Sequence, residues 1–391
     1  MDTQKLDQTY IANTYARFPV TIVKGKGSLV WDDTGKEYID LSTGIAVDIF
    51  GVADEEWMAA VTKQLGTLQH ISNLYYTEPC VKLAQMLCEK TGMKKVFFGN
   101  SGAEANECAI KAARKWSEEK NGKDYSTIIT LKNSFHGRTI TTLAATGQDV
   151  FHHDFTPLTE GFVYAEPNDL ADLEQLIKAN KCAAVMMEVV QGEGGVMPLD
   201  EAYVKGAAKL CEQYDLLLIC DEVQTGNGRT GKLYGYMHYG VQPDIVSTAK
   251  GLAGGLPLGA TLLGEKVQDV LSAGTHGSTF GGNPVCCAGA LAVLDEMDGD
   301  FLANVNERAA QLRAGLAKLP HVREVSGLGL MVGIAFDDGI KAADVRAACE
   351  KAGLLVLTAK TRLRLLPPLI LTADDVDDAL AILRSVLEKC V

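Results

Sequence analysis

The sequence lacks several features that would assign it to a whole class of proteins. It has no excess of positive charge, because 37 lysines and arginines face 50 aspartates and glutamates and the formal net charge is −13. Nucleic acids and anionic membranes are bound by basic surfaces, so this balance argues against both as partners. No apolar run reaches the length of about 20 residues that a transmembrane helix needs. The chain opens on a polar stretch, MDTQKLDQTY, that does not look like a signal peptide. We therefore expect a soluble, cytoplasmic protein.

Cysteine and histidine are present, but not in the patterns that hold metals or form disulfides. None of the ten cysteines forms a C-x-x-C pair, and the seven histidines do not combine with them at metal-site spacing. Several cysteines lie inside apolar runs, as Cys220 does at the end of LLLIC. Buried thiols of this kind are typical of a reduced, cytosolic protein. The sequence predicts neither a metal site nor a disulfide framework.

The middle of the chain alternates strand-like and helix-like segments. Five apolar runs without strict polar alternation are typical of strands covered on both faces; they are residues 126–131, 183–190, 216–223, 244–249 and 260–264. The helical segments among them are residues 102–119, 169–179 and 201–214. This order predicts an α/β fold with a large, mainly parallel sheet flanked by helices.

The pattern changes after about residue 290. A glycine-interrupted strand pair at 323–336 lies between helical segments, which predicts a smaller α+β unit. Near the N-terminus, the stretch around 33–35 is typical of a hairpin turn. Because 391 residues exceed one small domain, we expect three parts: an N-terminal segment that packs with the small domain (1–50), a large domain (51–290) and a small C-terminal domain (291–391).

The first candidate binding site is the run FFGNSGAEANE. Ser101 and Glu104 have the spacing of a capping box, so a helix is expected to begin here. Gly102 and Ala103 would leave the first-turn amides unshielded, which suits a phosphate group. Taken alone, a capped helix that binds nothing is the commoner meaning of this pattern.

Two further candidates follow apolar strands. The run LLLICDEV ends in Asp221 and Glu222, and the carboxyl ends of parallel strands are where open α/β sheets bind ligands. A buried carboxylate there needs a partner, such as a protonated pyridine nitrogen, although a structural aspartate paired with an arginine is the alternative. The strand DIVSTA leads Lys250 into a glycine-rich turn. A partly desolvated lysine can attack a carbonyl carbon, and the alternative is an ordinary turn lysine.

Three glycine-containing loops complete the set. GTHGSTFGGNP carries the hydroxyls of Ser278 and Thr279, which suit phosphate or substrate oxygens. NSFHGRT carries Phe135, which could stack on a ring, and Arg138, which could hold a carboxylate. Residues 226–231 match G-x-G-x-x-G literally, but little helical pattern follows, which disfavours a dinucleotide site.

In combination, the runs NSGAEANE, SFHGR, QGEGG, DEVQTGNGRTG, STAKGLAGG and STFGGNP resemble the class III aminotransferases of fold type I over nearly the whole chain. Within that family, SFHGR and GIAV are most similar to the acetylornithine branch of arginine biosynthesis. The resemblance implies a homodimer with shared active sites and pyridoxal 5'-phosphate on Lys250. It also implies transfer of the δ-amino group of N2-acetyl-L-ornithine to 2-oxoglutarate, giving N-acetyl-L-glutamate 5-semialdehyde and L-glutamate. The alternatives are an ornithine, succinylornithine or 4-aminobutyrate aminotransferase, a pyridoxal-phosphate isomerase or decarboxylase, and an NAD-dependent dehydrogenase.

The resemblance also implies the roles of individual residues. The cofactor-binding set is Gly102, Ala103, Phe135, Asp221, Glu222, Val223, Gln224, Lys250 and Thr279, the last from the neighbouring subunit. Lys250 and Asp221 are implied to be catalytic, Lys250 by moving a proton and Asp221 by keeping the ring nitrogen charged. The substrate-binding set is Arg138, Ser278, Glu193 and Arg364, in which Glu193 would neutralise Arg364 until glutamate binds. One segment departs from the family pattern, because Asp48 stands where many members have asparagine and residues 51–54 lack a G-H-x-H-P motif.

Overall fold

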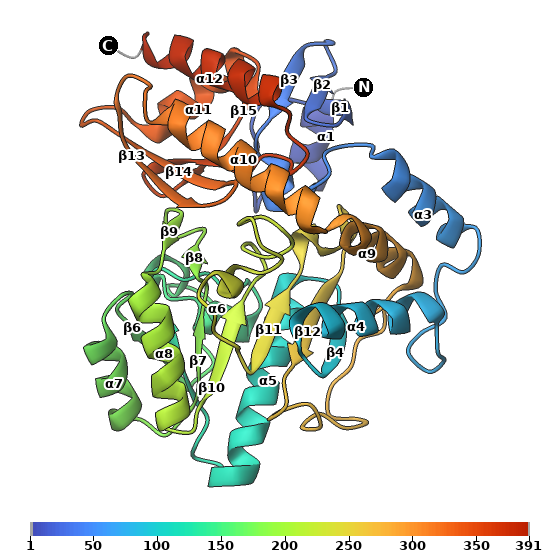
Figure 1. Ribbon diagram of the computed structural model, residues 1–391, viewed down its shortest axis with the longest axis vertical. Coiled ribbons are helices and arrows are strands. Elements are labelled where there is room, and N and C mark those ends of the chain that lie inside the picture. The colour runs from blue at the N-terminus through green and yellow to red at the C-terminus, as the bar shows by residue number, and fades with distance from the viewer. Residues whose placement is uncertain (1–2, 390–391) are drawn as a thin grey trace.

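The structure, a computed structural model, describes residues 3–389. Its larger part is built on a seven-stranded sheet in the order β4-β12-β11-β10-β7-β5-β6 (Figure 1). These strands are β4 (Lys95–Gly99), β5 (Thr127–Leu131), β6 (Phe162–Ala165), β7 (Cys182–Met187), β10 (Leu217–Asp221), β11 (Ile245–Thr248) and β12 (Gly259–Leu263). Only β12 runs against its neighbours, being antiparallel to both β11 and β4. The predicted large, mainly parallel sheet is confirmed.

The five apolar runs are strands because both faces of the sheet are covered. In β10, Leu217 and Ile219 pack in one apolar cluster with α5 (Gly102–Asn121). Leu218 and Cys220 point the other way, into the main core with α7 (Leu170–Ala179) and α8 (Glu201–Gln213). Successive side chains of a strand alternate between faces, so a strand buried on both sides needs an unbroken apolar sequence.

The remaining helices of the larger part lie around this core. They are α2 (Thr43–Ala46), α3 (Glu55–Leu65), α4 (Glu78–Thr91), α6 (Ile140–Ala145) and α9 (Pro284–Glu296), with short 3-10 turns η1 (Asp149–Phe151), η2 (Gly235–His238) and η3 (Lys250–Ala253). A two-stranded ribbon joins β8 (Val190–Gln191) to β9 (Met197–Pro198). Helix α9 packs on α3 and α4, and all three lie at the side of the sheet where β4 and β12 are (Figure 1).

The smaller part combines both ends of the chain. One sheet has the order β13-β14-β17-β16 and the other β1-β2-β3-β15. The strands are β1 (Ile22–Lys26), β2 (Leu29–Asp32), β3 (Glu37–Asp40), β13 (Val322–Leu328), β14 (Met331–Phe336), β15 (Leu354–Leu355), β16 (Leu357–Ala359) and β17 (Arg362–Leu365). Helices α1 (Thr3–Tyr10), α10 (Gly299–Leu316), α11 (Ala342–Lys351) and α12 (Ala373–Leu387) accompany them. The hairpins predicted at 33–35 and at 323–336 are confirmed as β2-β3 and β13-β14.

Strand β15 pairs in parallel with β3, so the N-terminal hairpin shares a sheet with the C-terminal part, and both lie above the large sheet in Figure 1. The boundaries at residues 50 and 290 stay a proposal. Within residues 3–389, no helix is both long and apolar enough to cross a membrane. In the same range, no group of three or more histidine, cysteine or acidic side chains could hold a metal ion. The nine cysteines in this range are free, and Cys390 lies outside it.

Candidate active site

Four strand ends bring three charged side chains and one aromatic ring to one edge of the large sheet. Asp221 is the last residue of β10, Glu188 directly follows β7, and Lys250 lies two residues beyond β11. Phe135 lies in the loop after β5. Because β11, β10, β7 and β5 are consecutive parallel neighbours, their carboxyl ends share this edge, where ligands bind in open α/β sheets.

Asp221 is held in one orientation by three donors. Its Oδ2 accepts hydrogen bonds from Asn106 Nδ2 and His136 Nδ1, both at 2.8 Å. Its Oδ1 accepts one from the Val223 amide at 3.0 Å. The side chain is buried, with 3% of its surface exposed. Such a fixed carboxylate is suited to pair with a protonated nitrogen of a bound ring.

Lys250 adopts a backbone conformation that non-glycine residues rarely adopt, with φ of +47°. Strained conformations of this kind cluster at functional sites. Burial lowers the pKa of its ammonium below the ordinary value of 10.5, and the nearby Arg364 acts in the same direction, against the attraction of Glu193 and Asp221. A lower pKa leaves more of the amine unprotonated and nucleophilic at neutral pH.

The start of α5 forms an open cradle for an anion. Ser101 caps the helix as predicted, since its Oγ accepts a hydrogen bond from the Glu104 amide at 3.2 Å. A Cβ placed on Gly102 would lie 2.6 Å from Cγ1 of Val223, so this position has no room for a side chain. Gly102 and Ala103 are half-buried at the first turn of α5, where free backbone amides and the helix dipole favour a phosphate.

Glu193, Gln224 and Arg364 form a second cluster beside Lys250. Arg364 is buried, with 3% exposed; its Nη1 contacts Glu193 Oε1 and donates to Gln224 Oε1 at 3.3 Å. Burial alone would raise the pKa of Glu193, but the charges of Arg364 and Lys250, together with the hydrogen bonds from Arg364 and Gln224, outweigh burial and lower the pKa. Arg364 Nε has no hydrogen-bond partner among residues 3–389. The charge of Arg364 is thus neutralised by one acid, and its Nε–H group is left to donate a hydrogen bond to a ligand.

Arg138 and Ser278 lie on the loops predicted for them. The Arg138 guanidinium lies 5.6 Å from the centre of the Phe135 ring and 4.3 Å from that of Phe151. Ser278 Oγ accepts a hydrogen bond from Asn100 Nδ2 at 3.1 Å, which ties its loop to the start of α5. Arg138 is exposed, so its charge is available to a substrate.

Two residues of the predicted cofactor set lie apart from this cluster. The Glu222 carboxylate accepts hydrogen bonds from the amides of Gly235 and Tyr236, each at 2.8 Å, and from Thr225 Oγ1 at 2.6 Å. Burial raises its pKa to about 7, and these contacts support a structural role instead of a cofactor contact. Thr279 is exposed on its loop, and no described contact joins it to Lys250.

Sequence reasoning passed over three residues of this site. Asn106 and His136 lie inside quoted motifs, yet their bonds to Asp221 were not expected. Glu188 is buried, and its carboxylate accepts hydrogen bonds from the Phe135 amide at 2.9 Å and the Gly192 amide at 3.4 Å. Burial, together with the charge of Asp221, raises the Glu188 pKa well above its ordinary value.

Two segments whose role the sequence left open, residues 226–231 and the stretch around Asp48, lie close to the turn that carries Lys250. The glycine run 226–231 forms turns and opens no helix, as its sequence predicts. Asn227 Nδ2 in this run donates to the Ala249 carbonyl at 3.0 Å. In the departing N-terminal segment, a Cβ placed on Gly251 would lie 2.7 Å from Cγ2 of Ile49. Burial and the nearby Asp40 raise the pKa of Asp48 to about 6.

The chain belongs to the class III aminotransferases, because residues 10–387 match the family model described as "Aminotransferase class-III". It is 53% identical over 386 residues to the acetylornithine aminotransferase of Haemophilus ducreyi, covering 99% of this chain and 98% of that protein. It is 44% identical over 378 residues to that of Methanocaldococcus jannaschii, covering 95% and 94%. The predicted family and enzyme class are confirmed.

Solved structures agree with the sequence relatives. The ornithine aminotransferase of Toxoplasma gondii superposes with a TM-score of 0.94 at 34% identity, covering 98% of this chain and 94% of that one. The N-acetylornithine aminotransferase of Stenotrophomonas maltophilia superposes with a TM-score of 0.86 at 37% identity, covering 98% of each chain. These likenesses confirm the predicted fold.

Proposed function

We propose that this aminotransferase moves the δ-amino group of N2-acetyl-L-ornithine to 2-oxoglutarate, giving N-acetyl-L-glutamate 5-semialdehyde and L-glutamate, with pyridoxal 5'-phosphate as its cofactor. The observation that carries the proposal is the position of Lys250. The charges of Glu193, Asp221 and Arg364 all act on the pKa of its amine, so these groups lie around it. Curated relatives named acetylornithine aminotransferase, at 42% to 53% identity over nearly the whole chain, support the choice of donor. A second Toxoplasma ornithine aminotransferase structure is described with partial occupancy of PLP at its active site.

The residues present fit this cofactor. The buried Asp221 offers a fixed carboxylate for a ring nitrogen, and Gly102, which packs closely on Val223, begins a helix whose first-turn amides suit a phosphate. When bound, the cofactor supplies an electron-accepting ring that stabilises negative charge on the carbon next to the transferred nitrogen. The residues that would hold it are Gly102 and Ala103 at the phosphate, Phe135 and Val223 at the ring faces, Gln224 at the ring hydroxyl, Asp221 at the ring nitrogen and Lys250 at the carbonyl carbon.

Lys250 acts as the proton carrier in this proposal. Its Nζ would remove the proton from the donor carbon that bears the δ-nitrogen and would later give that proton up again, so that one amine serves as both base and acid. A base works best when its pKa is near the working pH, and burial moves the pKa of Lys250 in that direction. Asp221, fixed by Asn106 and His136, would stabilise a positive charge on the ring nitrogen.

The enzyme must accept two unlike substrates, and the arginines suit this task. Arg138 would bind the α-carboxylate of acetylornithine and, in the other half-reaction, the distal carboxylate of glutamate or 2-oxoglutarate. Arg364 would bind the α-carboxylate of glutamate, because a planar guanidinium matches a carboxylate with two hydrogen bonds. While acetylornithine is bound, Glu193 neutralises Arg364 through the contact at Nη1. Glu193 thus acts as a gate: it determines whether Arg364 is available to bind the α-carboxylate of a substrate.

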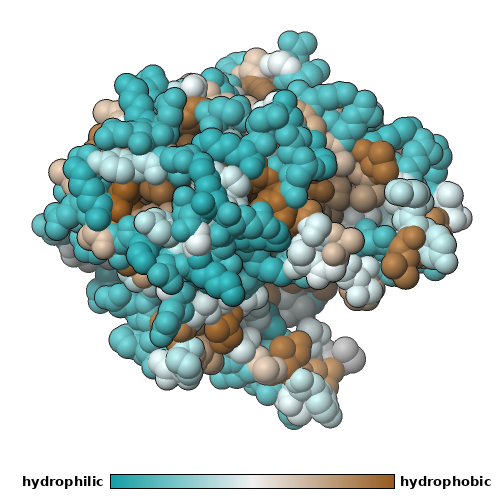
Figure 2. Space-filling view, turned by 90° about the horizontal axis from the view of Figure 1, so that it is seen from below, coloured by the Kyte–Doolittle hydropathy of each residue, from teal (hydrophilic) through white to brown (hydrophobic). Residues whose placement is uncertain are grey.

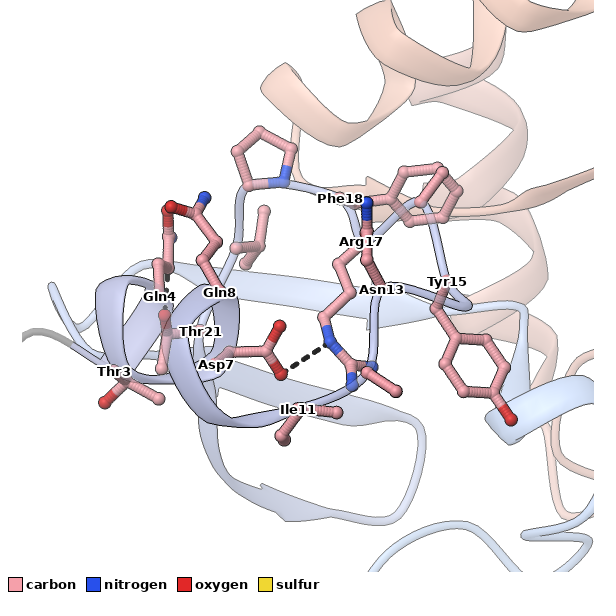
Figure 3. Close-up of a pocket in the computed structure, with 14 residues that line it drawn as sticks. Thr3, Gln4, Asp7, Gln8, Ile11, Asn13, Tyr15, Arg17, Phe18 and Thr21 are labelled. Carbon is pink, nitrogen blue, oxygen red and sulfur yellow. Dashed lines mark hydrogen bonds and ion pairs between the residues drawn. The ribbon is translucent and has the colours of Figure 1, made fainter.

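A homodimer is part of the proposal. Helix α1 buries none of its residues, and its segment folds around a hollow of about 590 Å³, across which Arg17 Nε pairs with Asp7 Oδ1 at 2.8 Å (Figure 3). Large apolar side chains are exposed in the segment before and at the start of α4, and these are Leu65, Ile71, Leu74, Tyr75, Tyr76 and Val81. On the face in Figure 2, hydrophobic side chains form several patches within a hydrophilic surface. A second copy covering such patches would bring Thr279 to the neighbouring site.

The free thiols favour a cytoplasmic location.

Comparison of amine donors tests the proposal. Purified enzyme with 2-oxoglutarate is offered N2-acetylornithine, succinylornithine, ornithine and 4-aminobutyrate, and glutamate is measured. The proposal expects the largest kcat/KM for N2-acetylornithine. Ornithine is the second candidate, because two structures of the Toxoplasma gondii ornithine aminotransferase superpose with TM-scores of 0.93 and 0.94. A larger kcat/KM for ornithine would replace the proposed donor.

A further inference from the structure

Arg138 lies against two aromatic rings and has no partner acid. Its guanidinium carbon is 4.3 Å from the centre of the Phe151 ring and 5.6 Å from that of Phe135. The two rings meet edge to face, with centres 5.9 Å apart and planes at 74°. Among residues 3–389, Arg138 forms neither a hydrogen bond nor an ion pair with another side chain or carbonyl. Its two ring contacts are therefore what fixes the guanidinium.

The segment that carries Phe151 is itself fixed to the loop of Phe135. Phe151 ends the 3-10 turn η1, and its amide donates to the Gln148 carbonyl at 3.0 Å. The Gln148 side chain donates from Nε2 to the Ser134 carbonyl at 3.0 Å, one residue before Phe135. On the other side of the turn, His152 Nε2 lies 3.0 Å from the Leu143 carbonyl. The closer of the two rings is thus part of a braced turn.

A guanidinium that rests on a ring is well prepared for a carboxylate. The ring occupies the flat face of the cation, and the N–H donors point outward in its plane. Two of these donors can then meet both oxygens of a carboxylate at once. A long arginine side chain loses much rotational freedom when it binds a ligand, and prior contact with a ring reduces that loss. An exposed contact of this type is worth a factor of about 2 to 5 in an equilibrium constant.

We propose that Phe151 is a positioning residue for substrate carboxylates, because its ring holds the Arg138 guanidinium where both substrates present a carboxylate. The inference rests on the proposed function of Arg138. Phe151 belongs to η1, outside the loop that carries Arg138. The proposed role of the Phe151 ring is exerted through its contact with Arg138.

A double-mutant cycle tests this role. The four enzymes are the wild type, Phe151→Leu, Arg138→Ala and the double variant, and kcat/KM is measured for 2-oxoglutarate. Leucine keeps an apolar side chain but has no ring face. We expect Phe151→Leu to raise KM for 2-oxoglutarate about 2- to 5-fold with little change in kcat, and to have no further effect when Arg138 is already alanine. Equal losses with and without Arg138 would overturn the proposal, because they would show a purely structural role.

Two further variants make the result specific. Phe151→Tyr keeps the ring and should keep the wild-type KM; a loss equal to that of leucine would also overturn the proposal. Phe162→Leu is the matched control, because Arg114 lies 5.0 Å from the centre of the Phe162 ring and this pair is at the opposite ends of the strands from the site. Phe162→Leu should leave the KM for 2-oxoglutarate unchanged. A rise in KM equal to that of Phe151→Leu would count against a site-specific effect. If the wild type does not use acetylornithine, the proposed donor is wrong. The role of Phe151 is still tested in that case, because the cycle measures kcat/KM for the acceptor 2-oxoglutarate.

Discussion

Replacing Glu193 with glutamine should shift the enzyme toward glutamate and away from acetylornithine. In the wild type, a carboxylate that approaches Arg364 meets the negative charge of Glu193, which contacts Nη1 of the arginine. Glutamine has nearly the same shape but no charge, so Arg364 is free to bind the α-carboxylate of glutamate. For acetylornithine, the same change leaves an uncompensated buried cation beside the substrate, which is unfavourable.

The exposure of the two side chains sets the size of the shift. The Arg364 side chain is 4% exposed and that of Glu193 is 31% exposed. Breaking a fully buried pair costs about 3–5 kcal/mol, and a surface pair is worth about 0–1 kcal/mol. This half-exposed pair lies between these limits, at about 1.5–3 kcal/mol, and Gln224 still offers an acceptor to Arg364. Since about 1.4 kcal/mol is a factor of ten, we expect the ratio of kcat/KM for glutamate to that for acetylornithine to rise about tenfold or more.

The assay measures both half-reactions under single-turnover conditions, with each amino donor in turn. The matched control is Glu324→Gln, because Glu324 pairs with Arg362 at 2.7 Å on the same strand as Arg364, and its side chain is 49% exposed. This control should keep the wild-type ratio. A Glu193→Gln ratio within about twofold of the wild type would show that the pair does not act as a gate.

Three other changes have definite expected outcomes. Lys250→Ala should lose both turnover and the absorbance of the bound cofactor near the visible edge, and a variant that keeps both would remove the lysine from the mechanism. Asp221→Ala should still bind some cofactor but lose most turnover, because the ring nitrogen loses its charged partner; full activity would contradict this. Glu222 has a pKa raised to about 7 from 4.5 in the fold, so the folded protein holds a proton that the unfolded chain releases, and stability falls as pH rises through this window. Urea unfolding at pH 5 and pH 8 should therefore show Glu222→Gln gaining on the wild type at the higher pH, and an unchanged difference would refute the buried titration.

The fold was largely predictable because its central strands are buried on both faces. Runs such as residues 216–223 carry so many apolar side chains that only a covered strand or a buried helix fits them. The direction of β12 could not be predicted, because its sequence, GATLL, is equally apolar in either direction. The pairing of β15 with β3 joins residues more than 300 positions apart, and two-residue strands such as β15 leave no periodic pattern.

The site was predictable where a local pattern carries the chemistry and not where a partner comes from elsewhere. Lys250 follows a strand into a glycine turn, which is visible in sequence. Glu188 follows β7 as Asp221 ends β10, so the same reasoning about strand ends would have found it. Alternation along β10 also indicates that Asp221 and Glu222 cannot both face the ligand. The contacts of Asn106 with Asp221 join residues 115 positions apart, and only the fold brings them together.

Reduction of the purified enzyme with borohydride, followed by peptide mass mapping, tests the central claim most directly, because it shows which amine carries the cofactor. We expect one pyridoxyl group per chain, fixed to the peptide that contains Lys250. A label on another lysine, or no label on cofactor-saturated enzyme, would contradict it.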